Sequence, residues 1–72
     1  MIEIEYKDLR LHHNYWFLWK DENGFDRYGS REVVKLRKDR IVIRRVIKGS
    51  VCGGIQVDIV PKDQIMGIYK FK

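Results

Sequence analysis

The sequence predicts one small, mostly β domain over residues 1–72, folded as a barrel or sandwich of five to seven short strands with at most one short helix. The 72 residues include nine Ile and seven Val but no Ala. Branched Cβ atoms suit the pleated surface of a sheet, whereas Ala is the strongest helix former. A second domain is excluded, because a chain of this length buries only ~60% of the surface that its unfolded form exposes.

The first twenty residues carry two strand patterns. Apolar and charged residues alternate over residues 2–7, which predicts a strand with one buried face and one wet face. The alternation slips at Asp8, where we expect a bulge or a short turn before residues 12–14. Residues 15–19 are all large and apolar. They predict either a central strand covered on both faces or a strand with an aromatic working face.

Two turn signals and one ambiguous segment follow. Asn23-Gly24 predicts a hairpin, because both residues tolerate the positive φ of a type I′ turn, and residues 25–28 would form the returning strand. Residues 30–38 allow two interpretations. Ser30 could cap a short helix, but the weak alternation through this segment favours a strand.

The C-terminal half predicts a second hairpin and a last strand. Residues 41–47 form a β-branched run, residues 53–54 are both Gly and allow a sharp turn, and residues 55–59 alternate again. Pro61 cannot donate to a ladder, so it marks a strand end or an edge strand. Residues 65–71 supply the last strand. The predicted domain has the size of SH3-like and Sm-like barrels, a likeness of dimensions that implies no function.

The positive charge is concentrated in one segment. The whole chain has a net charge of +5, and residues 31–48 alone hold eight basic residues against two acidic ones, a net of +6. Adjacent Arg44 and Arg45 cannot both face a core, so at least one is exposed or paired, and a bulge near Arg44 could turn both outward. Charges so concentrated repel one another unless an anion, a partner or nearby acids neutralise them.

This concentration predicts a small nucleic-acid-binding module, for DNA or RNA, that contacts phosphates through a basic β-hairpin with little sequence specificity. Trp19 is the aromatic residue that we expect to be exposed, where it would stack on single-stranded bases. A competing interpretation is that a charged edge hairpin only deters aggregation. The residues expected to bind nucleic acid are Arg37, Lys38, Arg40, Arg44, Arg45, Lys48 and Trp19.

Two other classes of function fit the same pattern. One is a protein-binding module or inhibitor, such as a viral or mobile-element accessory factor, that acts on an acidic partner surface. The other is a structural homo-oligomer with the aromatic strand as its interface. Self-association is expected in any case, because a 72-residue monomer covers both faces of residues 15–19 only with difficulty.

Catalysis, metal binding and cofactors are not expected. His12 and His13 would point to opposite faces of a strand, and Cys52, the single cysteine, has no second Cys-His pair at ligand spacing. The acidic residues are scattered, and no phosphate-cradling glycine loop is present. One cysteine fits a reducing compartment, and no apolar run is long enough to cross a bilayer, so we expect a cytoplasmic protein without a membrane partner.

Overall fold

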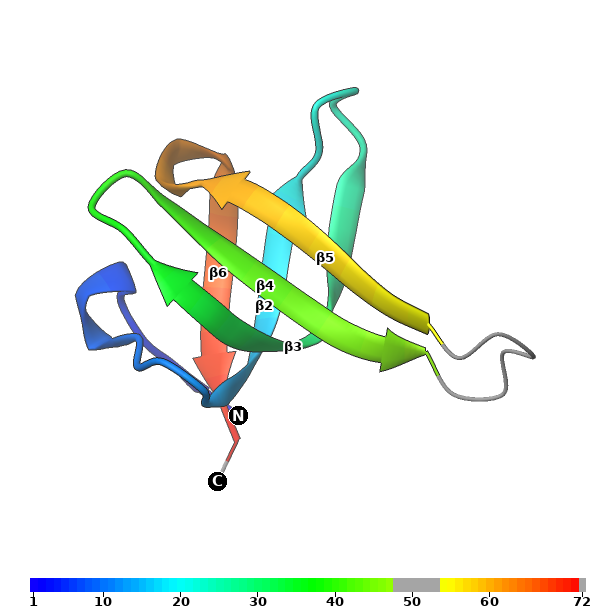
Figure 1. Ribbon diagram of the computed structural model, residues 1–72. Coiled ribbons are helices and arrows are strands. Elements are labelled where there is room, and N and C mark those ends of the chain that lie inside the picture. Colours follow the sequence, from blue (N-terminus) through cyan, green and yellow to red (C-terminus); the bar gives the residue numbers. More distant parts are fainter. Residues whose placement is uncertain (48–53, 72) are drawn as a thin grey trace.

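One antiparallel sheet forms the whole fold. The structure, a computed structural model, describes residues 1–47 and 54–71. Its six strands lie in the order β1-β6-β2-β3-β4-β5. Figure 1 shows β4 and β5 crossing in front of β2 and β6, so that the sheet folds over on itself. The strands are β1 (Ile2–Glu3), β2 (Asn14–Lys20), β3 (Asp26–Leu36), β4 (Arg40–Ile47), β5 (Gly54–Pro61) and β6 (Ile65–Lys70), and the short 3-10 turns are η1 (Tyr6–Asp8) and η2 (Lys62–Gln64).

The mostly β prediction is confirmed, and the described residues contain no α-helix. The closure of the sheet into a barrel is not confirmed. Strands β1 and β5 stand at the two ends of the strand order and do not pair with each other in the described part of the chain. No helix in residues 1–47 and 54–71 is long and apolar enough to span a membrane.

Strand β3 makes the fold possible because it belongs to both halves of the sheet. Residues 26–32 pair with β2, and residues 32–36 pair with β4. The register with β4 shifts between Val33 and Lys35, so Val34 is an extra residue in β3. Such a bulge bends and twists its strand. The two halves of the sheet therefore face each other across one concave side.

The core fills this concave side. Residues 15–19 form the centre of β2, which lies between β3 and β6, so the strand is central as predicted, but only one of its faces is fully covered. Tyr15, Phe17 and Trp19 point inward and are at most 5% exposed, whereas Trp16 and Leu18 on the convex face are half-buried. The buried apolar residues are Leu9, Tyr15, Phe17, Trp19, Val33, Ile41, Ile43, Val60 and Ile68.

The strand predicted over residues 2–7 is wrong beyond Glu3. The chain turns at η1, where the Glu5 amide donates a hydrogen bond to the Asp8 carboxylate at 3.1 Å. Ile4 and Tyr6 still pack against the core, and Leu9 lies within it. The apolar alternation therefore marked burial for Ile4 and Tyr6 but not for Ile2, which is 45% exposed, and a short 3-10 turn buries the two residues as well as a strand would.

The Asn23-Gly24 hairpin is confirmed, although its turn is not type I′. Gly24 has a φ of 81°, and Asn23 is not among the described residues with positive φ. The Gly24 amide donates a hydrogen bond to the Asp21 carbonyl at 3.0 Å. The two central residues of the turn are therefore Glu22 and Asn23, one position earlier than the predicted Asn23 and Gly24. The Asp21 carboxylate accepts hydrogen bonds from the Phe25 and Asn23 amides, and these bonds lower its pKa. This is a type I turn followed by a left-handed glycine.

Residues 30–36 form the second part of β3, so the strand interpretation of the ambiguous segment is confirmed. The bulge predicted near Arg44 in β4 lies instead in the neighbouring strand β3. Strand β4 pairs with β5 in unbroken register. Arg44 and Arg45 therefore remain on opposite faces of the sheet. Pro61 is the last residue of β5, an edge strand, as predicted.

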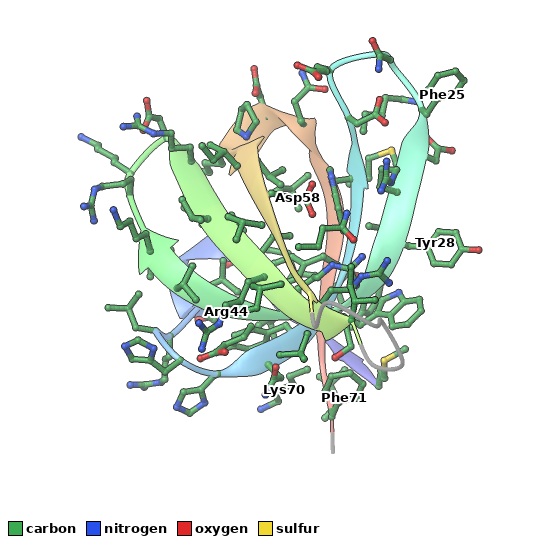
Figure 2. All side chains as sticks on the ribbon, turned by 45° about the vertical axis from the view of Figure 1, so that its right-hand side comes forward. Phe25, Tyr28, Arg44, Asp58, Lys70 and Phe71 are labelled. Atoms are coloured by element: carbon green, nitrogen blue, oxygen red, sulfur yellow. The ribbon has the colours of Figure 1, made fainter. Side chains whose placement is uncertain are left out.

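Strand β5 alternates as predicted, but its apolar side is the exposed one. Ile55, Val57 and Ile59 are 60%, 56% and 66% exposed on the convex face. Gln56 and Asp58 occupy the opposite face, and Figure 2 shows Asp58 pointing into the space between β5 and the strands behind it. An alternation of apolar and polar residues shows which residues share a face of the strand, but it does not show which of the two faces the rest of the protein covers.

Removal of the central core side chain tests this arrangement. Phe17→Ala leaves a cavity at a position that is 1% exposed, and we expect a loss of about 3–5 kcal/mol in the free energy of unfolding. Phe25→Ala is the matched control, because Phe25 is 67% exposed, and its effect should stay within about 0.5 kcal/mol. Urea denaturation measures both. Equal effects of the two substitutions would contradict the position of the core.

Candidate nucleic-acid interface

The basic segment does not form one surface. Arg37, Lys38 and Arg40 lie in and beside the turn between β3 and β4. Arg44 lies on the convex face of β4, and Arg45 lies on its concave side. Lys48 lies outside the described residues. The single positive patch expected from the sequence is therefore divided, because the strand in its middle sends successive side chains to opposite faces.

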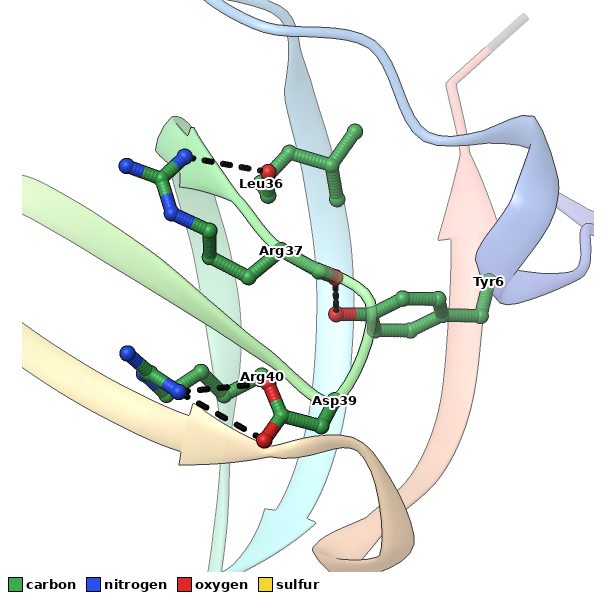
Figure 3. A network of polar contacts seen from close by, with 5 residues as sticks. All are labelled: Tyr6, Leu36, Arg37, Asp39 and Arg40. Atoms are coloured by element: carbon green, nitrogen blue, oxygen red, sulfur yellow. Dashed lines mark hydrogen bonds and ion pairs between the residues drawn. The ribbon is translucent and has the colours of Figure 1, made fainter.

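The β3–β4 turn is held in place by both 3-10 turns. Its ends are joined by a hydrogen bond from the Arg37 amide to the Arg40 carbonyl, at 2.9 Å. Figure 3 shows the Tyr6 hydroxyl of η1 donating to the Arg37 carbonyl, at 2.6 Å. The Lys62 amide of η2 donates to the Asp39 carbonyl at 2.8 Å. Burial, followed by the charge of Asp39, raises the pKa of Tyr6, so the donating hydroxyl keeps its proton at neutral pH.

The side chains of this turn carry charge that is only partly compensated. Arg37 and Lys38 are exposed, and neither has a carboxylate within ion-pair distance in the described part of the chain. Arg40 contacts Asp39 at 3.2 Å, in an exposed pair of low strength. Lys62 lies over the Tyr6 ring, with its Nζ 5.2 Å from the ring centroid. We call Arg37, Lys38, Arg40 and Lys62 the basic turn.

The positive charge of Arg44 is compensated by a neighbouring carboxylate. Its Nε donates to a Glu32 carboxylate oxygen at 2.9 Å, directly across from β4 to β3. His12 Nδ1 lies 3.6 Å from the other oxygen of the same carboxylate. The hydrogen bond from Arg44 is the main reason why the pKa of Glu32 is lowered. Arg44 thus contributes little free positive charge to the surface.

The concave side holds an arginine that the sequence did not single out. Arg31 is 4% exposed, and its guanidinium carbon lies 5.4 Å from the centroid of the Trp19 ring. Its Nη1 donates to the Ser30 carbonyl at 2.8 Å, while its buried Nε has no hydrogen-bond partner in the described residues. Desolvation, and then the charge of Arg45, lowers the pKa of Arg31. A Cβ on Gly29 would collide with Arg31 Nη1, so glycine makes room for the buried guanidinium.

The expectation that Trp19 is exposed is wrong. Trp19 is 2% exposed beneath Arg31, because its side of β2 faces the core, so it offers no platform for a base. The exposed aromatic residues of this region are Phe25 and Tyr28, and Figure 2 shows both pointing away from the molecule, on the side opposite the β3–β4 turn. Tyr28 also covers Trp16, with ring centroids 5.8 Å apart.

No family model, curated protein or solved structure matches this chain.

The Arg44–Glu32 pair predicts a pH-dependent contribution to stability. Because the pKa of Glu32 is lowered in the folded protein, its contribution is complete above the ordinary glutamate pKa and is lost as the pH falls through the lowered value. Glu32→Gln should be less stable than the parent protein at pH 7 and equally stable at strongly acidic pH, as measured by urea denaturation at stepwise lower pH. Glu22→Gln, at an exposed site, serves as the control. A difference that stays constant at every pH would contradict this role of the charge.

Proposed function

We propose that this protein is a non-enzymatic binding module that attaches to nucleic acid through the phosphate backbone, with the basic turn as its contact surface. The observation that carries the proposal is the exposed pair Arg37 and Lys38, without carboxylate partners in the described residues, on a turn fixed by Tyr6 and Lys62. Long basic side chains on a fixed backbone lose less conformational entropy on binding than the same side chains on a free loop.

The chemistry of the basic turn favours phosphate over a specific base sequence. Two of its four residues are arginines, whose planar guanidinium group suits two parallel hydrogen bonds to phosphate oxygens. Contacts of this kind position a protein on nucleic acid and carry no sequence information. We therefore propose binding to DNA or RNA with little preference among sequences.

The proposed contact surface is narrower than the one expected from the sequence. Arg44 is paired with Glu32, Arg45 lies on the concave side of β4 against Gln56, and Trp19 is buried, so we leave all three out of the proposed surface. Lys62 joins it from a distant part of the sequence. For the architecture we propose a half-open barrel, supported by the bend of β3 and by the shared concave core of the two sheet halves.

Salt dependence tests the proposal. If the four residues of the basic turn each neutralise one phosphate, log affinity should fall with log salt with a slope near −3 to −4 on duplex DNA, from about −0.9 per contact. Arg37→Ser combined with Lys38→Ser should flatten this slope by about 2 and weaken binding by the same factor for unrelated sequences. Fluorescence anisotropy with a labelled duplex measures both quantities.

The matched control for this experiment is Arg44→Ser, which removes an arginine of the same segment whose charge Glu32 already compensates. We expect its slope to equal that of the parent protein within error. An Arg44 effect as large as that of the double substitution would contradict the basic turn as the contact surface. Absence of binding to any duplex at low salt would contradict the function and favour an acidic protein as the partner.

A further inference from the structure

Strand β5 has a free edge and an exposed apolar side. It is the last strand of the sheet, so one row of its backbone amides and carbonyls has no partner strand in the described part of the chain. Ile55, Val57 and Ile59 are more than half exposed, as is Val46 beside them on β4. An exposed, hydrophobic edge strand of eight residues is a template for pairing with another strand, which folded proteins usually cover or block.

The space along this edge is unfilled. A cleft of about 700 Å³ lies between β5 and the β2–β3 hairpin. Val57, Asp58 and Ile59 line it from one side, and Arg27 and Asn23 from the other. The bend of β3 carries the hairpin away from β5 and leaves the cleft open, so another strand has access to the edge.

We propose that β5 pairs with β5 of a second copy of this chain, antiparallel and edge to edge, around a two-fold axis at Val57. This interface does not rest on the proposed function, although Lys62 of the basic turn directly follows β5. A two-fold interface places the same surface on both copies, so each residue contact occurs twice.

The sequence of β5 selects this register. With the axis at Val57, Ile55 faces Ile59 of the second copy and Val57 faces its own equivalent, which joins two short apolar stripes into one. On the other side of the sheet, Gln56 faces Asp58 of the second copy, and an amide can donate to a carboxylate.

Neighbouring registers are worse. An axis at Asp58 brings two carboxylates directly opposite each other, which is destabilising. An axis at Ile59 places Pro61, which has no amide hydrogen, opposite Val57. An axis at Gln56 pairs Asp58 with Gly54, which offers the carboxylate no side chain across the interface and leaves it only the Gln56 amide of its own chain, at 3.5 Å. The inward-pointing Asp58 therefore restricts the pairing to one register.

In the proposed register, side chains of opposite charge from the two copies approach each other. Arg31 lies close enough to Arg45 and Arg27 to be repelled by their charges, and Asp58 attracts it. Arg45 Nε donates to the side-chain oxygen of Gln56 at 2.9 Å. In the proposed register, Asp58 of the second copy lies beside Gln56 and brings a further carboxylate to this positive region. Because the interface is two-fold, this contact between Asp58 of one copy and the Arg45–Gln56 pair of the other is made twice.

Charge reversal at the two-fold axis tests the register. Val57→Lys and Val57→Glu each place like charges opposite each other, so each variant alone should sediment as a monomer at concentrations at which the parent protein is a dimer. An equimolar mixture should restore a one-to-one dimer, because Lys then faces Glu. Both substitutions fall at a residue that is 56% exposed, and circular dichroism checks that each variant retains its β-sheet.

Val46→Lys is the matched control, since Val46 is 64% exposed on the same face but not on the edge strand. It should leave the dimer intact. Hydrogen exchange on the parent protein gives a second measurement: alternate β5 amides should become protected as the protein is concentrated. A monomeric parent protein, a dimer that survives Val57→Lys, loss of the dimer on Val46→Lys, or β5 amides that exchange rapidly at all concentrations would each overturn the proposal.

Discussion

The double pairing of β3 is the constraint on which the rest of this structure depends. The first half of β3 pairs with β2 and its second half pairs with β4. The extra residue at Val34 bends the strand between the two halves. The bend brings Phe17 of β2 and Ile43 of β4 into one core. It also leaves the outer edge of β5 without a partner strand in residues 1–47 and 54–71, and it places the charged β3–β4 turn where η1 and η2 can hold it. The core, the free edge and the exposed charge are three consequences of one bend.

The same geometry explains why the basic segment has several roles. Its turn residues extend beyond the sheet and remain exposed, but its strand residues must follow the alternation of β3 and β4. Arg44 therefore meets Glu32 on the convex face, Arg45 meets Gln56 on the concave side, and Arg31 is buried over Trp19. A buried arginine is costly unless its donors are satisfied, and the contact with an aromatic face offsets part of that cost. Charge density along the sequence is a poor guide to charge density on a surface when the segment is a hairpin.

Local signals predicted most of the strands but not which of their faces would be covered. The β-branched runs, the central aromatic strand, the Asn23-Gly24 turn and Pro61 at the end of an edge strand were all predictable, because each depends on residues close together in the chain. The burial of Trp19 and the exposure of Ile59 were not predictable. Trp19 belongs to an uninterrupted apolar run and Ile59 to an alternating strand, yet Trp19 is buried and Ile59 is exposed, as the bend of β3 and the strand order determine. The contribution of Lys62 was equally hidden, since only the folded chain brings it to Asp39.

We propose that the basic turn, rather than Arg44 or Arg45 of β4, is the surface through which this protein contacts nucleic acid. The most direct measurement is a titration of the isotope-labelled protein with a short DNA duplex, followed by the amide resonances of each residue. If the basic turn is the contact surface, the resonances of residues 37–40 and of Lys62 should shift together and saturate at one affinity. The resonances of Arg44, Arg45 and Phe25 should not move. Shifts centred on Arg44 and Arg45, or on the exposed aromatic residues of the β2–β3 hairpin, would contradict it.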